Sequence, residues 1–304
     1  MFGNSSQGFE KSEPLSPELT FGIERLCKGE FQNGLRVTSD GGGIERIEAR
    51  FRGNGFSPHR HDTYALGLTL HGVQTFRYRG ADRFSSPGKV IVLHPDEVHD
   101  GAAGTADGLI YRMVYLPPEL IGSVHAHTRS LPFVPDPVVT NEDLWHALAT
   151  ILYDLDHGPD ELALDDAIAR ISVILSIEAG APAKPVTKIA RIAILRARDY
   201  LTSHSDETIR SETLEALTGL DRYSLARQFR LLLGTSPHRY VMMRRLDRAK
   251  LLMEAGVGLA RVAAECQFSD QAHLTRQFRS AFGMTPGRWL AMRADRHIRL
   301  SNPA

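Results

Sequence analysis

The stretch RYSLARQFRLLLGTSPHRYV, residues 222–241, recurs as QAHLTRQFRSAFGMTPGRWL at residues 271–290. Eight of the twenty aligned positions are identical, and the alignment needs no gap. Self-similarity at a fixed offset is typical of a structural unit that a chain uses more than once. The C-terminal third of this 304-residue chain is therefore expected to contain two copies of one unit.

Each copy carries the signals that begin and end a helix. Asp221 and Asp270 are favoured N-cap residues, because their carboxylates accept hydrogen bonds from the first backbone N–H groups. Gly234 and Gly283 suit the left-handed position just past a helix end. A short helix and a tight turn precede each copy. The sequence thus predicts two helix-turn-helix units, at about 208–233 and 258–283.

One long helix is expected between the copies. Ser236 is its predicted cap, Pro237 occupies the first turn, where proline is tolerated, and Gly256 ends it. About 19 residues at a rise of 1.5 Å give a length of ~28 Å. This length approaches the ~34 Å that separates successive major grooves on one face of DNA.

Charge is distributed unevenly along the chain. From Lys188 to Arg299 there are 20 Lys and Arg against 11 Asp and Glu, whereas residues 1–187 hold 16 against 25. A basic segment attracts the phosphates of nucleic acids. An ordinary solvated basic surface fits the charge equally well, so the interpretation depends on the repeat.

The N-terminal part has a different pattern. Residues 42–116 are rich in short strand signals, and the segment Val73–Arg79 alternates aromatic and arginine side chains, as a strand with one buried face does. Such strands, broken by Gly and Pro turns, predict a small antiparallel barrel or sandwich. Two amphipathic helices follow within 141–180. They either cover the barrel or pair with a second copy, and we expect a homodimer.

These patterns predict an α+β multidomain protein. Its expected parts are a disordered N-terminus at 1–20, a barrel domain with appended helices at 21–180, a linker at 181–187 and an all-α DNA-binding domain at 188–299. The chain has two cysteines, far apart, and no apolar run of the ~20 residues that cross a bilayer. We therefore expect a cytoplasmic protein without disulfides and without a membrane partner.

From Leu214 to the end of the second copy, the sequence resembles the DNA-binding domain of the AraC/XylS family. The resemblance implies a transcription regulator that binds double-stranded promoter DNA, contacts RNA polymerase and acts more often as an activator than as a repressor. It implies base contacts by Arg222, Tyr223, Ala226 and Arg227 in the first unit, and by Gln271, Ala272, Thr275 and Arg276 in the second. Arginine can read guanine and glutamine can read adenine in the major groove. Phosphate contacts are expected instead for Arg230, Arg239 and Arg279.

Two residues depart from the family pattern. Glu215 stands where a small residue is usual, which concerns the packing of the first unit. Gln267 stands where glycine is usual, in the turn of the second unit. A non-glycine residue with a positive φ carries a cost, which leaves an adjustment of that turn open.

The segments PHRHDTYALGLTLHG (58–72) and PGKVIVLHPDEVHDG (87–101) resemble the two strand motifs of a cupin barrel. In metal-binding cupins an H-x-H pair, a carboxylate and a later histidine converge inside the barrel. His59, His61 and His99 match the histidines, which makes a divalent transition metal a candidate cofactor. The expected carboxylate is not evident. The alternative is that the three histidines form hydrogen bonds along a pocket or surface.

Regulators of this family often carry a cupin-like domain for sensing. The mouth of a barrel is a common small-molecule site, and the candidate aromatic wall of an effector pocket is formed by Tyr64, Phe76, Tyr78, Tyr111 and Tyr115. We therefore expect a regulator controlled by a small-molecule effector, and not an enzyme. The alternative is a metal-dependent cupin enzyme, an oxygenase or isomerase, fused to a DNA-binding domain.

Overall fold

The structure is a computed structural model that describes residues 33–39, 43–124, 130–180 and 186–294. The predicted disordered N-terminus, 1–20, lies outside these residues, as do residues 181–185 of the predicted linker.

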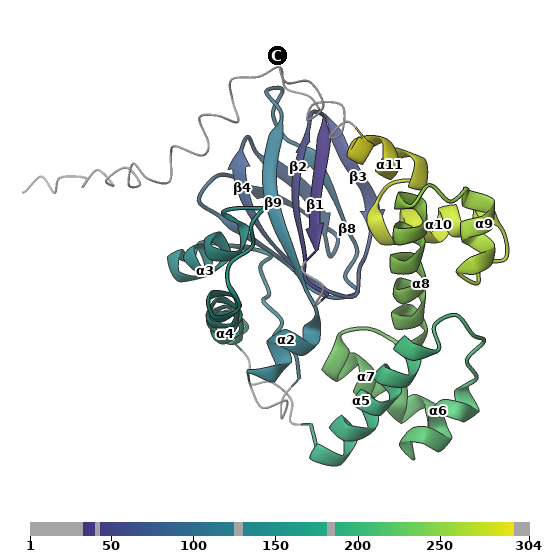
Figure 1. Ribbon diagram of the computed structural model, residues 1–304. Coiled ribbons are helices and arrows are strands. Elements are labelled where there is room, and N and C mark those ends of the chain that lie inside the picture. Colours follow the sequence, from purple (N-terminus) through teal and green to yellow (C-terminus); the bar gives the residue numbers. More distant parts are fainter. Residues whose placement is uncertain (1–32, 40–42, 125–129, 181–185, 295–304) are drawn as a thin grey trace, which may run out of the picture. The chain divides into compact units, whose positions relative to one another are not determined.

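The N-terminal domain is built from two antiparallel sheets (Figure 1), as predicted for a cupin-like barrel. One sheet has six strands in the order β1-β2-β9-β4-β7-β10, and the other has four in the order β3-β8-β5-β6. The strands are β1 (Gly34–Ser39), β2 (Glu45–Phe51), β3 (Asn54–His59), β4 (Tyr64–His71), β5 (Gln74–Tyr78), β6 (Ala81–Ser85), β7 (Val90–Leu93), β8 (His99–Ala103), β9 (Leu109–Leu116) and β10 (Val138–Val139). In β5, Phe76 and Tyr78 are buried and Arg77 is exposed, which confirms the predicted alternation.

Neighbouring residues of the larger sheet belong to different cores, because successive side chains of a strand point to opposite faces. Ala65 and Met113 face the barrel interior, in a cluster that we call the inner core. Leu66 and Val114, the next residues along β4 and β9, belong to an outer core. Three helices cover that outer face: α2 (Pro118–Ser123), α3 (Glu142–Leu152) and α4 (Glu161–Glu178).

The C-terminal domain is helical, as predicted. Its helices are α5 (Lys188–Ser203), α6 (Ser211–Thr218), α7 (Arg222–Leu233), α8 (Pro237–Glu254), α9 (Leu259–Glu265), α10 (Gln271–Phe282) and α11 (Pro286–Ala294). Asp221 and Asp270 cap α7 and α10, and Gly234 and Gly283 end them with φ of 71° and 69°. These caps confirm the helix boundaries predicted from the repeat.

The helix α8 lies between two cores. Tyr240 and Val241, near its start, belong with Leu225 and Phe229 to the core of the first helix-turn-helix unit. Further along α8, Met243, Leu246 and Met253 pack with Leu274 and Phe278 of the second unit. That second cluster is continuous with the inner core of the barrel. Among the described residues no helix is long and apolar enough to cross a membrane.

Both departures from the family pattern have a structural outcome. The Glu215 carboxylate lies outside the core and accepts hydrogen bonds from the backbone N–H and the guanidinium of Arg222 at 2.8 and 3.2 Å. It therefore adds a cap to α7 rather than disturbing the packing. Gln267 has a φ of 62°, so the second turn keeps the left-handed conformation without a glycine.

Candidate functional site

The exposed faces of α7 and α10 carry the residues predicted to meet DNA bases. Arg222, Tyr223 and Arg227 are exposed on α7, where Tyr223 keeps 81% of its surface. Gln271, Ala272 and Arg276 are exposed on α10, and Ala226 and Thr275 are half-buried. Leu225, Phe229, Leu274 and Phe278 are buried on the opposite faces. Each helix therefore presents a continuous polar face from its N-terminal half, the part that enters a major groove in helix-turn-helix proteins.

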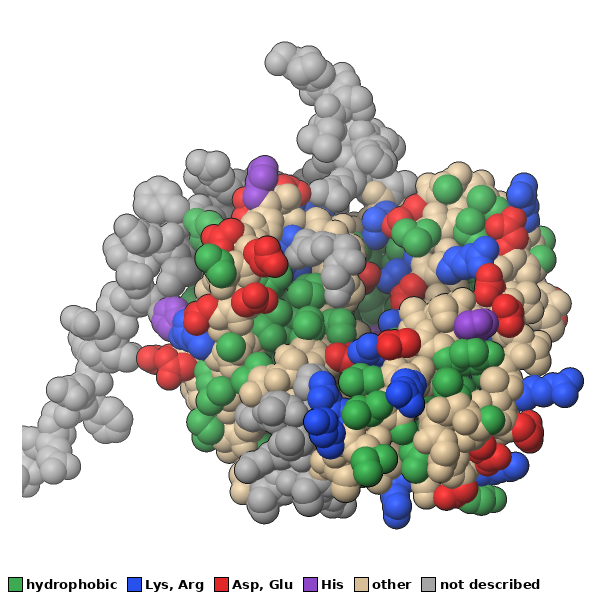
Figure 2. Space-filling view, turned by 60° about the horizontal axis from the view of Figure 1, so that its bottom comes forward, with side chains coloured by type: hydrophobic (Ala, Val, Ile, Leu, Met, Phe, Trp, Pro, Cys, Tyr) green, Lys and Arg blue, Asp and Glu red, His purple; other side chains and the backbone are tan. Residues whose placement is uncertain are grey.

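Acidic residues accompany the basic ones around the first unit. Arg222 forms ion pairs with Glu212 at 3.8 Å and Glu215 at 3.2 Å, so its guanidinium must exchange these partners before it can meet a base. Figure 2 shows the side of the molecule on which α5, α6 and α7 lie, where Lys and Arg side chains stand among Asp and Glu side chains. On this side, basic side chains are thus interspersed with acidic ones.

The three predicted phosphate contacts have different surroundings. Arg230 and Arg279 are exposed near the C-terminal ends of α7 and α10. Arg239 is only 8% exposed, and its guanidinium donates to the backbone carbonyl of Arg60 in the barrel. The prediction for Arg239 is therefore corrected: in this arrangement it ties α8 to the barrel and does not face a phosphate.

The barrel contacts the C-terminal end of α10, the recognition helix of the second helix-turn-helix unit. The backbone N–H of Ser57 donates to the carbonyl of Gly283 at 2.8 Å, and that of Arg60 donates to Ser280 at 3.1 Å. Gly283 packs so closely that an added Cβ would lie 2.7 Å from His59 Nδ1 and 2.8 Å from the Ser57 carbonyl oxygen. At this position glycine is required both by its positive φ and by the close approach of β3.

The barrel domain also contacts the C-terminal end of α7, the recognition helix of the first unit. The backbone N–H of Leu131 donates to the carbonyl of Leu231 at 3.3 Å. A Cβ added to Gly234 would lie 2.5 Å from Cβ of Pro95. The barrel domain therefore contacts both recognition helices at the ends opposite to their predicted base-reading residues.

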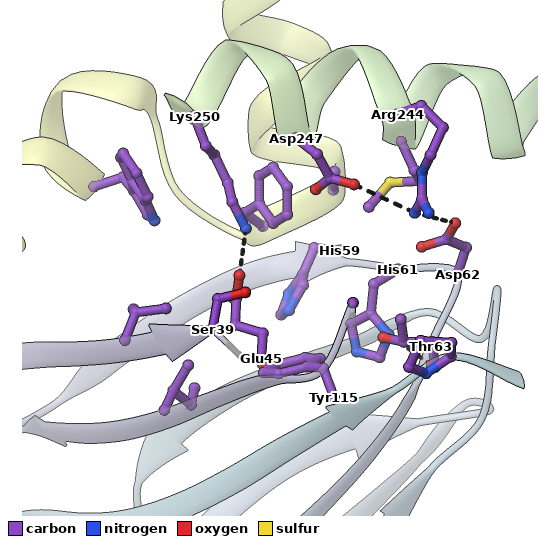
Figure 3. A pocket seen from close by; sticks show the side chains of 18 of the residues that line it. Ser39, Glu45, His59, His61, Asp62, Thr63, Tyr115, Arg244, Asp247 and Lys250 are labelled. Carbon is purple, nitrogen blue, oxygen red and sulfur yellow. Dashed lines mark hydrogen bonds and ion pairs between the residues drawn. The ribbon is translucent and has the colours of Figure 1, made fainter. Parts of the chain in front are cut away.

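A pocket of about 570 Å³ opens between the barrel and the C-terminal domain. Figure 3 shows its two walls, with Glu45, His59 and His61 on the barrel side and Asp247 and Lys250 on α8. Ion pairs join the walls: Lys250 to Glu45 at 2.7 Å and Arg244 to Asp62 at 2.9 Å. Burial raises the pKa of Asp62 to about 6, against the opposing effect of Arg244. The volume of the pocket lies within the range of small-molecule sites.

The three predicted metal-ligating histidines lie together beside this pocket. The ring centres of His59 and His99 are 4.3 Å apart, those of His61 and His99 are 4.9 Å apart, and those of His59 and His61 are 6.2 Å apart. Each Nδ1 faces a backbone carbonyl, of Ser57, Thr63 and Glu97 respectively. Burial lowers the pKa of all three imidazoles, that of His99 to about 4. They are therefore neutral at pH 7.

The arrangement of these histidines does not fit a metal site. Within the described part of the chain, no group of three or more His, Cys, Asp and Glu side chains could hold a metal ion. Asp62, the nearest carboxylate in sequence, is bound to Arg244 instead. The divalent metal therefore stays a prediction.

The five aromatic residues predicted to line an effector pocket are dispersed. Only Tyr115 lines the pocket described above. Phe76, Tyr78 and Tyr111 are buried in the inner core, and Tyr64 lies in the outer core, where its hydroxyl donates to the carbonyl of Pro132 at 2.6 Å. The predicted wall is therefore corrected for this pocket, because four of its five members are packed against other side chains.

Two family models match the chain, the AraC-like ligand binding domain over residues 41–171 and a helix-turn-helix domain over residues 214–292. The chain belongs to the AraC/XylS family. The protein is thus a transcription regulator that combines an AraC-type ligand-binding domain with a helix-turn-helix DNA-binding domain.

Relatives and solved structures agree with this membership. The HTH-type transcriptional regulator YbfI of Bacillus subtilis (strain 168) is 26% identical over 247 residues, which cover 75% of this chain and 86% of YbfI. The probable transcriptional regulator LumQ of Photobacterium leiognathi is 32% identical over 86 residues, 28% of this chain and 35% of LumQ. A structure of ToxT from Vibrio cholerae has a TM-score of 0.60 at 11% identity, with 82% of this chain and 98% of that one covered, and it shows the shared fold.

Several residues of this AraC/XylS regulator's pocket were missed in the sequence. Arg244, Asp247 and Lys250 are three residues apart along α8 and all line the pocket. Residues spaced by three or four lie on one face of a helix, so the sequence could have predicted this charged face of α8. No local signal indicates that the barrel lies opposite this face, because the partner residues Glu45 and Asp62 are about 200 residues away along the chain.

Proposed function

We propose that the protein regulates transcription from a promoter through an effector that binds in the pocket between the barrel and α8. The single observation that carries this proposal is that one domain both lines the pocket and contacts the ends of α7 and α10. A ligand in the pocket touches the residues that join the two domains. It can therefore change how the two recognition helices are held.

The proposed mechanism is a shift between two arrangements of the domains. Without effector, the hydrogen bonds to Gly283, Ser280 and Leu231 fix the recognition helices against the barrel. An effector that binds better to a second arrangement favours it in proportion to the difference in affinity. In that arrangement α7 and α10 enter successive major grooves. As the family implies, the DNA-bound form acts as an activator and contacts RNA polymerase.

The class of effector is a separate question. Two ToxT structures are described as bound to an unsaturated fatty acid and to a naphthalenyl butenoic acid. A hydrophobic acid is therefore one class to test here. The described pocket has a volume of about 570 Å³, enough for a small organic molecule.

We also propose that the regulator is a homodimer in the cytoplasm and pairs through α4. Leu162, Val173 and Ile177 are 82%, 45% and 71% exposed. Spacings of 11 and 4 residues place them on one face of the helix. Val173→Asp with Ile177→Asp should convert dimers to monomers in analytical ultracentrifugation, whereas Ile189→Asp, at an exposed position of α5, should not. A wild-type monomer would contradict this part of the proposal.

The alternative, a metal-dependent cupin enzyme, is the less supported function. It would need a metal at His59, His61 and His99, and among the described residues no group of this kind could hold one. We propose that the protein is not an enzyme. Elemental analysis of the purified chain tests this: a stoichiometric transition metal that is lost in His59→Ala and His99→Ala would revive the alternative.

The experiment that tests the proposed function is selection of bound fragments from random duplex DNA by the full chain at near-physiological salt. We expect an enriched motif of two short elements about 10 base pairs apart. The control is the Arg227→Ala, Arg276→Ala double variant, which should enrich no motif. Wild-type binding without any enriched sequence would favour an architectural DNA-binding protein instead.

A further inference from the structure

The pocket between the barrel and α8 is lined by more acidic than basic side chains. Its five carboxylates are those of Glu45, Asp62, Glu119, Asp247 and Glu254, and its three cations are Arg244, Lys250 and Arg293. Glu119 is paired with Arg198, a cation outside the lining, at 3.7 Å, so the lining keeps an excess of one negative charge. Charge of one sign on the walls of a concave site favours a ligand of the opposite sign.

All three cations of the lining are already paired. Lys250 binds Glu45 at 2.7 Å and Arg293 binds Glu254 at 2.6 Å. Arg244 lies between two carboxylates, those of Asp62 at 2.9 Å and Asp247 at 3.3 Å. Each cation also lies over an aromatic ring, with distances of 4.7 to 4.8 Å to the ring centre. An anionic ligand would compete with these carboxylates for the same cations.

Asp247 is the charged group best placed to meet a ligand. It shares Arg244 with Asp62, so one guanidinium serves two carboxylates. The Asp247 side chain is 44% exposed, whereas that of Asp62 is 4% exposed. In Figure 3 the Asp247 carboxylate points from α8 toward the barrel wall that carries His59 and His61.

The facing wall offers a hydrogen-bond acceptor. His61 is 5% exposed and lines the pocket, and its Nε2 has no hydrogen-bond partner among the described residues. Its Nδ1 faces the Thr63 carbonyl at 2.9 Å and so carries the ring proton. Nε2 then presents a lone pair, and a buried acceptor without a donor is costly. A ligand N–H group would remove that cost.

We propose that the effector of this regulator is a cationic amine with an apolar body, whose ammonium group lies between the Asp247 carboxylate and Nε2 of His61. This inference rests on the proposed function, because it names the ligand class for the same pocket. The ammonium donates to both groups and offsets the excess negative charge of the lining. The apolar body packs against the hydrophobic part of the lining, which includes Val37, Phe56 and Met243.

The test uses three probes with one skeleton: 2-phenylethylamine, 3-phenylpropanoate and 2-phenylethanol. Trp289 lines the pocket, and the chain has two tryptophans, so the Trp145→Phe full-length variant reports binding through Trp289 fluorescence. We expect the amine to bind about tenfold or more tightly than the acid, since like charges brought together at an interface are costly. The alcohol should fall between them.

Two further variants in the Trp145→Phe background locate the charge. Asp247→Asn should weaken amine binding about fivefold or more and narrow the difference between amine and acid. Asp165→Asn removes the same charge from an exposed position of α4 and should change neither value. A melting temperature for each variant checks that it is folded.

The outcomes separate this inference from the proposed function. If the acid binds more tightly than the amine, for example at the unpartnered Nε of Arg244, the amine proposal is wrong. It is also wrong if Asp247→Asn does not change amine binding. In both cases the pocket remains a ligand site. If none of the probes changes Trp289 fluorescence in a folded protein that still selects its DNA motif, both the amine and the pocket are overturned.

Discussion

The two helix-turn-helix units share their sequence signals but differ in how they are held. The first unit has a core of its own, in which Leu225 and Phe229 pack with α5 and the start of α8. The second unit shares its core with the barrel, and β3 adds backbone hydrogen bonds to Gly283 and Ser280. The repeat thus determines the helices of each unit, whereas residues outside it determine the attachment of each unit. The second unit is thus joined to the barrel through a continuous apolar core, whereas the first is joined through separate contacts such as those of Leu131 with Leu231 and of Arg60 with Arg239.

Removing the matched core phenylalanines tests whether the two units have separate cores. Phe278→Ala should lower the free energy of unfolding of the barrel and second unit together by about 3–5 kcal/mol. Phe229→Ala should cost a similar amount but melt the first unit alone. Guanidinium denaturation in the Trp145→Phe background, followed by Trp289 fluorescence, distinguishes them. If Phe229→Ala moves the Trp289 transition as far as Phe278→Ala does, the two cores are one.

Acid should act on the barrel first. Burial lowers the pKa of His94 to about 3 and of His99 to about 4, below their ordinary value. Below about pH 6.5 the unfolded chain therefore binds more protons than the folded one, and the free energy of unfolding falls as pH falls. The expected loss between about pH 7 and pH 5 is roughly 2 kcal/mol for each of these histidines.

Denaturant titrations across this pH range measure that loss. His94→Asn should flatten the slope of unfolding free energy against pH by about one proton. Tyr78→Phe removes the hydroxyl that lies 2.8 Å from His94 Nδ1 but keeps the imidazole, so it should retain the slope. A slope equal in wild type and His94→Asn would show that His94 does not supply this acid sensitivity.

On DNA, two substitutions in α10 should have different effects, one on base recognition and the other on phosphate binding. Arg276→Ala should cost about 1–3 kcal/mol of specific binding and relax base preference in one half of the motif only. Arg279→Ala should weaken all sequences alike and reduce the salt slope by about one. Competition binding at several salt concentrations measures both. Unchanged specific binding by Arg276→Ala would mean that α10 does not read the second element.

The smallest expected effect isolates the contact between β3 and the second unit. Gly283→Ala and Gly219→Ala both place alanine at a φ of 69°, at a backbone cost of about 1 kcal/mol each. A Cβ at Gly219 meets nothing within 4 Å, whereas one at Gly283 meets His59 and Ser57. Only Gly283→Ala should loosen the barrel and raise effector-free DNA affinity. Equal affinities in the two variants would argue against a restraining contact.

The helices of the repeat and the strand-rich character of residues 42–116 followed from local signals in the sequence. Asp221, Asp270 and the two C-terminal glycines act through residues within a few positions of themselves, so their roles were readable. The pocket could not be predicted in this way, because it forms where segments far apart in sequence meet. Arg239 illustrates the difference: its repeat position suggested a phosphate contact, but the barrel carbonyl of Arg60, 179 residues away, occupies its guanidinium. Four of the five predicted aromatic residues lie in cores rather than along this pocket for a related reason, since strand alternation marks a buried face without distinguishing a core from a cavity.

The shared helix α8 spans from one reading unit to the other and also forms a wall of the pocket. Its 18 residues make a rod of ~27 Å. A tilt of about 5° at one end displaces the other by roughly 2 Å for a rod of this length. In the proposed mechanism, α8 therefore sets the spacing of the two units, and the proposed effector binds against its side. A small molecule that tilts α8 would therefore change the spacing and the relative rotation of the two recognition helices along the DNA.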